Sequence, residues 1–405
     1  MVNIAILGFG VVGSGVAEVL TQNKAIIEGK LQEEINIKYI LDLREFPDSP
    51  FGQLVIHDFN TILSDSEVSI VAEMMGGSHP AYDFTKAALL AGKSVVTSNK
   101  EVVANFGSEL LEIARQNNVA YLFEASVGGG IPIIRPMCND LSSNNVTEIS
   151  GILNGTTNYI LTKMTQEGIP FATVLKDAQD KGYAERNPSA DVDGLDAARK
   201  IVILAALAFG KAIAADKIHV EGITDISTED VDAAARLGYS VKLIGHARKI
   251  NGRILAMVSP RLIPSSNPLS GINDVYNGIL LDGDMVGKVM FYGPGAGKLP
   301  TASAVCADIV DIVAHKDGTL KLPEFSPASE DDIASFDEYT CKRFFTFEKC
   351  SGCEISKEKA EKTFGKIEKL ELNGDRVALI TEPMSEKRAS DIRSKLKECK
   401  SYRLL

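Results

Sequence analysis

Ile-Ala-Ile-Leu-Gly-Phe-Gly-Val-Val-Gly, residues 4–13, is the stretch that decides the fold of this chain. A short apolar strand, residues 4–7, runs directly into the pattern G-x-G-x-x-G, and a helical pattern follows over residues 14–28. In this setting the glycines permit a tight turn that brings backbone N–H groups and a helix N-terminus to a pyrophosphate. The alternative is a glycine-rich turn that binds nothing. The residues expected at the dinucleotide are Gly8, Phe9, Gly10, Val11, Val12 and Gly13.

Outward from this turn, strand-like and helix-like segments alternate up to residue 123. The pattern predicts strands at 35–41, 68–75, 94–97 and 119–123, with helices at 80–91 and 100–116. Repeated units of this kind imply a parallel sheet with helices on both faces, and ligands bind beyond the carboxyl ends of its strands. Ser98 and Lys100 fall at such an end, although Lys100 could merely begin a helix.

The end of the second strand carries two residues with opposite implications for the nucleotide. Asp42 would accept a hydrogen bond from the adenosine ribose of NAD, whereas Arg44 would accommodate the 2′-phosphate of NADP. The choice between the two nucleotides therefore stays open.

A second glycine run, residues 127–132, follows Glu124 and lies too far along the chain to share the first phosphate. It offers a carboxylate and a row of backbone carbonyls, which are oxygen ligands suited to a hard cation. The run also suits a hinge that leaves the nucleotide domain, and the two interpretations are compatible.

From about Pro132 the order of strand-like and helix-like segments changes to that of a mixed α+β domain. The pattern predicts a strand at 147–153, a polar turn at 154–158, a helix at 159–167 and strands near 237–248, 251–263 and 276–291. Such a sheet is expected to leave one face free for another subunit. A turn-rich loop at 293–303 then leads into a helix at 302–314, and this loop either closes over the dinucleotide or simply crosses back between domains.

Residues 182–200 place ionisable groups at one end of an apolar helix. Glu185 and Asp191 lie in the loop, Asp196 and Lys200 share a helix face, and Asp193 is expected to cap the helix. Because a helix that is apolar all round is normally buried, Lys200 should border a cavity, and a partly buried lysine beside carboxylates is a candidate proton donor. The alternative is a capped helix with a solvated salt bridge.

The C-terminal part reads as a linker at 317–338 followed by a small module. Its predicted order is strand 341–348, helix 355–364, strands 366–372 and 375–382, helix 385–398 and strand 401–405, a ferredoxin-like βαββαβ arrangement. Cys350 and Cys353 form a single C-x-x-C, which suits free structural thiols better than a zinc or redox site.

Composition limits the possible functions. A chain of 405 residues is expected to form two or three domains, and a net charge of −11 argues against binding to nucleic acid or anionic lipid. No signal peptide and no membrane helix are expected, which predicts a cytoplasmic protein. Six cysteines in so long a chain do not suggest a disulfide scaffold.

Six motifs together resemble the homoserine dehydrogenase family over roughly residues 1–315. They are GFGVVGSG at 8–15, SNKEVVAN at 98–105, EASVGGGIPII at 124–134, ILNGTTNYIL at 152–161, GYAERNPSADVDGLDAARK at 182–200 and GPGAGKLPTASAV at 293–305. The tail resembles a degenerate ACT module, the regulatory unit that this family often carries. The resemblance implies a Rossmann domain at 1–133 plus about 300–320, a catalytic and dimerisation domain at 134–299, and an ACT-like domain at 339–405.

The resemblance also implies the chemistry. The family interconverts L-aspartate 4-semialdehyde and L-homoserine with NAD(P)H on the route to threonine, methionine and isoleucine, and it forms homodimers or dimers of dimers. Lys200 would be the proton donor and Lys100 its electrostatic support. Glu185, Asp191 and Asp196 would bind the substrate. The further cofactor positions are Arg44, Ser98, Lys100, Gly182 and Gly297, with NADP slightly favoured, and a monovalent cation, Na or K, would be held by Glu124, Val127, Gly129 and Ile131.

Two features limit the resemblance: Asp42 and Arg44 together do not decide between NAD and NADP, and the tail departs from a sensing ACT domain. Where a sensing ACT domain usually has an acidic residue and glycine after its first strand, this chain has Glu-Lys-Cys-Ser-Gly-Cys at 348–353, so threonine feedback is doubtful. Two other functions compete with the resemblance. An acylating semialdehyde dehydrogenase would use Cys138 as nucleophile, with His79 or His246 as a base brought near by the fold. A dinucleotide sensor would keep the glycine turn and would have no need of the two lysines and their carboxylates.

Overall fold

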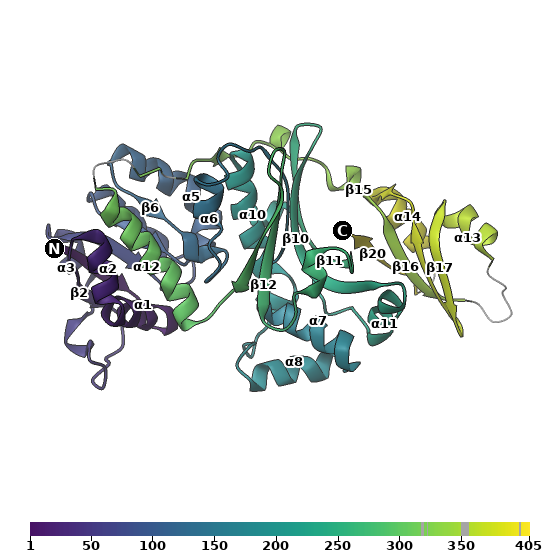
Figure 1. Cartoon of the computed structure of the whole chain (residues 1–405), viewed down its shortest axis with the longest axis horizontal. Coiled ribbons are helices and arrows are strands. Elements are labelled where there is room, and N and C mark those ends of the chain that lie inside the picture. The colour runs from purple at the N-terminus through teal and green to yellow at the C-terminus, as the bar shows by residue number, and fades with distance from the viewer. Residues whose placement is uncertain (317–319, 322, 350–355, 397) are drawn as a thin grey trace.

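The chain is described here from a computed structural model covering residues 1–316, 320–321, 323–349, 356–396 and 398–405. Figure 1 shows an elongated molecule in which the N-terminal sheet, a central sheet and the C-terminal module follow one another along the long axis. The helix α10 (Leu195–Phe209) stands between the first two, and it packs against α5 (Lys100–Gln116) on one side and against strands of the central sheet on the other.

The N-terminal sheet is parallel and doubly wound, which confirms the predicted fold class. Its strand order is β3-β2-β1-β4-β5-β6. Alternate residues of a strand face opposite sides of a sheet, so Ile4 and Ile6 pack under one helical layer while Ala5 and Leu7 pack under the other. The strands are β1 (Val2–Leu7), β2 (Ile35–Leu41), β3 (Val55–Ile56), β4 (Val68–Glu73), β5 (Ser94–Thr97) and β6 (Tyr121–Leu122).

The remaining helices include the expected ones, with shifted ends, and five that were not predicted, namely α3, α6, α8, α9 and α11. They are α1 (Val11–Gln22), α2 (Lys24–Leu31), α3 (Phe59–Ser64), α4 (Ala81–Leu90), α6 (Ile134–Cys138), α7 (Gly155–Glu167), α8 (Phe171–Asp180), α9 (Ser189–Val192), α11 (Thr228–Arg236), α12 (Lys298–Ala314), α13 (Lys357–Phe364) and α14 (Glu386–Lys395). The helix α12 brings the chain back to the nucleotide sheet, where its buried side chains share a core with those of α1.

The central sheet is mixed and continues without a break into the C-terminal module. Its order is β13-β12-β7-β10-β11-β20-β16-β18-β17, with β9 added beside β11. The strands are β7 (Val146–Ile152), β9 (His219–Val220), β10 (Tyr239–Ile250), β11 (Arg253–Pro264), β12 (Tyr276–Gly283), β13 (Gly287–Pro294), β16 (Arg343–Glu348), β17 (Ile367–Asn373), β18 (Arg376–Thr381) and β20 (Lys400–Leu404).

The C-terminal module has the predicted βαββαβ order. Its last strand, β20, lies between β16 of the module and β11, so the module is joined to the rest of the central sheet through backbone pairing. One face of the module packs on α13 and α14, while Phe344, Tyr402 and Leu404 belong to the large central core.

The predicted linker is ordered where the structure describes it. It forms β14 (Ser326–Pro327), which pairs with β8 (Lys211–Ala212), and two short 3-10 turns, Glu330–Asp332 and Phe336–Glu338. A second two-stranded pair joins β15 (Thr340–Cys341) to β19 (Met384–Ser385). The C-x-x-C cysteines, Cys350 and Cys353, lie outside the described residues. Within the described part of the chain, no helix combines the length and apolar character that a bilayer crossing needs.

Four local predictions were wrong. The helix expected at 14–28 is two helices, α1 and α2, separated at Asn23. The helix expected at 159–167 begins at Gly155, because Asn154 caps it. The strand expected at 276–291 is a hairpin, β12 and β13, and the helix expected at 302–314 begins at Lys298.

Candidate active site

The glycine turn after β1 has the geometry of a phosphate cradle. A Cβ on Gly13 would lie 1.9 Å from the carbonyl oxygen of Gly8, so only glycine fits there. The first turn of α1 follows Gly10, which has no side chain to cap its backbone N–H groups, and Val11 is 67% exposed although it is apolar. An open helix N-terminus beside an exposed apolar residue fits a dinucleotide pyrophosphate.

A cavity of about 380 Å³ opens beside this turn, between the nucleotide sheet and α10. Both lysines singled out from the sequence, Lys100 and Lys200, line it, as do the predicted cofactor residues Val11, Val12, Ser98 and Gly297. Gly8, Phe9, Gly10 and Gly13 form the turn itself, whereas Gly182 lies exposed in a separate surface loop and does not line the cavity.

Asp42 and Arg44 form a pair beside the glycine turn. Asp42 accepts hydrogen bonds from the Phe9 backbone N–H at 2.8 Å and from the Arg44 side chain at 3.0 Å through Nε and again through Nη2. The Arg44 guanidinium lowers the pKa of Asp42 to about 2, so that carboxyl stays ionised. The Arg44 side chain is 63% exposed, which leaves its guanidinium accessible from solvent.

The two lysines meet at one carboxylate. Asp196 lies 2.9 Å from the Lys200 Nζ and 3.1 Å from the Lys100 Nζ, and Lys200 also donates to the Leu153 carbonyl at 2.8 Å. Lys200 and Asp196 are buried, whereas the Lys100 side chain is 38% exposed. The solvated salt bridge that the sequence allowed is therefore wrong for the Asp196–Lys200 pair.

Asn154 holds the two aspartates of this cluster by hydrogen bonds. The sequence analysis placed it only in a polar turn. Its Oδ1 accepts from the Thr157 N–H and caps α7, while its Nδ2 donates to Asp191 at 2.7 Å and to Asp196 at 2.9 Å. The signal was present, because an asparagine before a helix is a common N-cap. Asp193, the predicted cap of α10, is exposed, and the helix begins after Gly194 instead.

The acids of the cluster differ in their protonation behaviour. Burial on its own would raise the pKa of Asp196, but the charges of Lys200 and Lys100 hold it below its usual range. Burial raises the pKa of Asp191, and the nearby Asp196 charge adds to that shift. The site therefore holds two ammonium groups around one firmly ionised carboxylate, an arrangement that stabilises negative charge on a neighbouring oxygen.

The Glu185 carboxylate takes no part in the described contacts that join Lys100, Lys200, Asp191 and Asp196. Its side chain is exposed, and no described residue forms a hydrogen bond or an ion pair with its carboxylate. The loop that carries it is anchored to the start of α7, because Thr156 Oγ1 donates to the Tyr183 carbonyl at 2.6 Å.

The predicted cation residues lie where two glycine loops meet, namely the run at 127–132 and the loop at 293–297. The Glu124 carboxylate accepts from the backbone N–H groups of Ile133, Ile134 and Arg135 at 2.6–2.8 Å, so it caps α6 and is not free for a cation. Among the described residues, no hydrogen bond was found to the carbonyl oxygens of Val127, Gly129 or Ile131. No group of three metal-ligating side chains occurs in the described part of the chain.

Cys138 does not have the surroundings of a catalytic nucleophile. Burial raises the pKa of its thiol to about 11, which suppresses the reactive thiolate. His79 pairs with Asp83, and His246 lies between Glu148 and Arg261, so both histidines have other partners. These contacts contradict the acylating-enzyme alternative.

The chain is similar to known proteins over nearly its whole length. Residues 8–124 match the family described as homoserine dehydrogenase, NAD binding domain, and residues 132–310 match the family described as homoserine dehydrogenase. Homoserine dehydrogenase of Lactococcus lactis subsp. lactis is 42% identical over 353 residues, covering 86% of this chain and 82% of that protein. The enzyme of a Synechocystis strain is 43% identical over 349 residues, covering 84% and 79%.

Solved structures agree with the sequence matches. A homoserine dehydrogenase from Thiobacillus denitrificans superposes with a TM-score of 0.90 at 33% identity, covering 100% of this chain and 98% of that one. A hyperthermophilic archaeal homoserine dehydrogenase in complex with NADPH gives a TM-score of 0.67 at 29% identity, covering 80% and 99%. The doubly wound domain, the paired lysines and these matches together show that this chain is an oxidoreductase that belongs to the homoserine dehydrogenase family.

Proposed function

We propose that the chain catalyses the reversible reduction of L-aspartate 4-semialdehyde to L-homoserine, a step towards threonine, methionine and isoleucine. The observation that carries this proposal is the Lys100–Asp196–Lys200 cluster at the wall of the cavity beside the glycine turn. A nicotinamide dinucleotide bound there supplies the hydride. The surrounding residues supply charge, a proton and substrate contacts.

The lysines have separate roles in this proposal. Reduction of the aldehyde leaves negative charge on oxygen, and Lys200 stabilises that charge and donates the proton that completes the hydroxyl. Lys100, which is more exposed and bound to the same Asp196, adds positive charge near the nicotinamide end. Asp196 and Asp191, joined by Asn154, contribute to the substrate site together with Glu185.

The direct test follows absorbance at 340 nm while the full chain meets L-homoserine with NADP⁺ and, separately, NAD⁺ at mildly alkaline pH. Reduction of either nucleotide that depends on homoserine supports the proposal. Absence of reduction in both, together with no oxidation of NADPH or NADH by L-aspartate 4-semialdehyde, would exclude it. The assay is run in potassium, sodium and tetramethylammonium salts, so that the rates with and without a small monovalent cation can be compared.

We expect Glu185→Gln to raise the KM for L-homoserine by about 10- to 100-fold, the equivalent of losing one charge-assisted hydrogen bond to the substrate ammonium. The kcat should change little, because this contact is made before and during the reaction alike. Steady-state kinetics check the prediction, with Asp180→Asn as a control on a nearby exposed acid. An unchanged KM in Glu185→Gln would remove this residue from the substrate site.

We propose that NADP is preferred over NAD. Both oxygens of Asp42 are occupied by Phe9 and Arg44, and the Arg44 guanidinium is the accessible charge at this end of the turn. We therefore expect Arg44→Gln to lower kcat/KM for NADP⁺ by about 10- to 100-fold, with a much smaller effect for NAD⁺. Kinetics with both nucleotides and an Arg44→Lys control check this, and equal losses for the two nucleotides would contradict it.

A monovalent cation, sodium or potassium, is proposed at the junction of the two glycine loops. The support is chemical, since the carbonyl oxygens of Val127, Gly129 and Ile131 have no hydrogen-bond partner found among the described residues and oxygen ligands suit hard cations. The backbone carbonyl of Glu124 would contribute in place of its carboxylate, which is occupied in capping α6.

The assembly and the C-terminal module complete the proposal. Exposed apolar side chains gather on the hairpin of β12 and β13, namely Tyr276, Met285, Val286, Met290 and Tyr292, which supports a homodimer, or a dimer of dimers, formed through the central sheet. The βαββαβ order and the antiparallel strand order β20-β16-β18-β17 support an ACT-like module over 339–405. The cytoplasm is the proposed location, as for other enzymes of amino-acid biosynthesis.

A further inference from the structure

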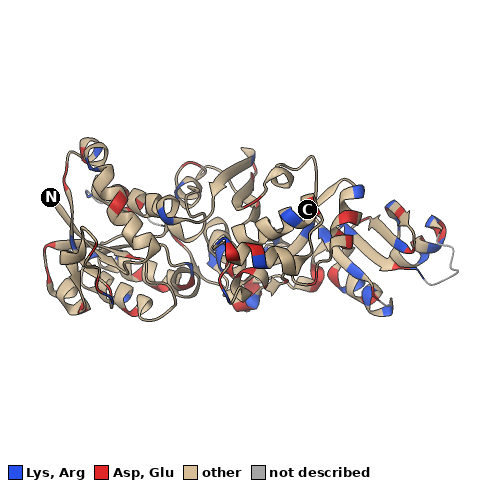
Figure 2. Cartoon of the chain, turned by 90° about the horizontal axis from the view of Figure 1, so that it is seen from below, with Lys and Arg blue, Asp and Glu red and all other residues tan. Residues whose placement is uncertain are grey.

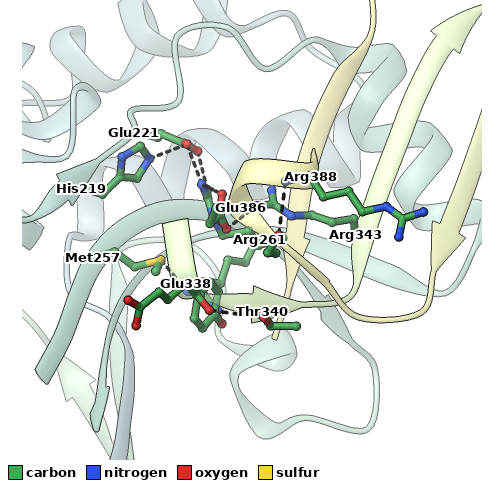
Figure 3. A network of polar contacts seen from close by, with 12 residues as sticks. His219, Glu221, Met257, Arg261, Glu338, Thr340, Arg343, Glu386 and Arg388 are labelled. Atoms are coloured by element: carbon green, nitrogen blue, oxygen red, sulfur yellow. Dashed lines mark hydrogen bonds and ion pairs between the residues drawn. The ribbon is translucent and has the colours of Figure 1, made fainter. Parts of the chain in front are cut away.

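A buried group of charges lies where the C-terminal strand meets the central sheet. Figure 3 shows Glu221 and His219 of the catalytic region close to Glu386 at the start of α14. Arg403 of β20 is 2% exposed and donates to Glu221 at 2.7 and 2.9 Å and to Glu386 at 2.8 and 2.9 Å. One guanidinium therefore joins the C-terminal module to Glu221.

Glu221 belongs to a segment that touches the start of the catalytic helix. The Glu221 N–H donates to the Val258 carbonyl, and the Ile223 N–H donates to the Val192 carbonyl, both at 2.8 Å. A Cβ on Gly222 would lie 2.4 Å from the Val192 oxygen, so the two backbones are in direct contact. The position of Glu221 thus constrains the residues that precede α10.

The residues before α10 and the first turn of that helix carry the two aspartates of the proposed site, Asp191 and Asp196. Val192 lies between Asp191 and the start of α10, and Asp196 lies in the first turn of that helix. Asn154 holds Asp191 and Asp196 from the opposite side. We infer that Arg403 is a positioning residue, which acts through Glu221 to fix the first turn of α10 and with it the Asp196–Lys200 pair.

This inference rests on the proposal that Asp196 and Lys200 serve the reaction. Without the Arg403 guanidinium, the one described residue that still pairs with the Glu221 carboxylate is His219, at 2.6 Å, and the Glu221 side chain is already 35% exposed. The carboxylate is then free to turn towards solvent, and the 221–223 segment keeps its backbone hydrogen bonds but loses its side-chain contact to β20. Among the described residues, no hydrogen bond joins the 221–223 segment to the dinucleotide turn at 8–13.

The test compares Arg403→Gln, Glu221→Gln and the double variant in the full chain, below the onset of unfolding. We expect each single variant to lower kcat for homoserine oxidation by about 10-fold or more, as small displacements of catalytic groups do. The dissociation constant for NADPH should stay within 2-fold, Arg403→Lys should recover part of kcat, and the double variant should be no slower than the slower single one.

The control removes a different charged contact of the same module. Arg376 lies 2.6 Å from Asp230 of α11, away from the 221–223 segment. Arg376→Gln should lower the melting temperature while leaving kcat unchanged. If Arg403→Gln does not fold, Glu221→Gln serves as the test variant, because glutamine has nearly the same shape as glutamate and the side chain at position 221 is partly exposed.

Three results would overturn the inference: normal kcat in folded Arg403→Gln and Glu221→Gln, an equal loss of kcat in Arg376→Gln, or fully additive losses in the double variant. Failure of the proposed function gives a different result, because the unaltered chain itself would then not oxidise homoserine. Failure of the Lys200 role alone would leave Lys200→Ala active. If Lys200→Ala is inactive and Arg403→Gln is normal, only the positioning role is lost.

Discussion

The Lys200→Ala variant is expected to lose about 10²- to 10⁴-fold in kcat, the range typical of a missing general acid. An ammonium group has three donors, and in this structure one meets Asp196 and another the Leu153 carbonyl. The third is left for the substrate oxygen. Because Lys200 is held by α10 and lines the cavity, its loss removes a placed proton and a placed charge together.

The measurement is single-turnover and steady-state kinetics in both directions, with NADPH affinity measured separately by fluorescence. NADPH should bind to Lys200→Ala about as it binds to the unaltered chain, because the glycine turn and Arg44 are untouched. Lys200→Met, which keeps the volume of the side chain, separates loss of charge from loss of packing. Lys176→Ala alters an exposed surface ion pair and serves as the control. Near-normal turnover in both Lys200 variants would contradict the role of proton donor.

Most of the nucleotide sheet could be predicted from the sequence, although its edge strand β3 was not and β4 and β6 are shorter than expected. The strands Ile35–Leu41 and Ser94–Thr97 and the helix Lys100–Gln116 have the predicted bounds. Each is a run of apolar or periodically apolar residues with turn-forming or polar residues at its ends. In a chain of alternating strands and helices, the connections make the sheet parallel. The cluster of Asp196 and Lys200 was also accessible, because residues four apart on one helix are neighbours whatever surrounds them.

Contacts between distant segments could not be predicted. Asn154 bonds to residues 37 and 42 positions further along, and Arg403 bonds to a glutamate 182 positions away. Local periodicity contains no information on such pairs, since it describes only which face of an element is apolar. The same limit explains why the C-terminal module was expected behind a plain linker, whereas its last strand completes the central sheet.

The distribution of charged residues argues against binding to nucleic acid. In Figure 2, acidic and basic residues are interspersed along the ribbon, as expected for a chain with a net charge of −11. Nucleic-acid binding depends on basic residues gathered against phosphates. The positive groups of the proposed site are instead few and local, namely Lys100 and Lys200 at the cavity and Arg44 beside the glycine turn.

The Asp196→Ala variant is expected to lose about 3–5 kcal/mol of unfolding free energy, the usual cost of leaving a buried charge without its partner. Lys200 is the charge left behind, since both side chains of this pair are more than nine-tenths buried. Lys100 is affected less because its side chain is 38% exposed and reaches solvent. Activity should fall as well, because the ammonium groups lose the carboxylate that places them.

The double variant Asp196→Leu with Lys200→Met separates stability from catalysis. Replacing both members of a buried ion pair by apolar residues of similar size is often neutral for stability or better, so this variant should recover most of the free energy that Asp196→Ala loses. It should nevertheless be as inactive as Lys200→Ala. Urea unfolding and homoserine oxidation, measured on the same preparations, check both halves. A double variant as unstable as Asp196→Ala would show that packing, rather than the unpaired charge of Lys200, sets the loss of stability in that variant.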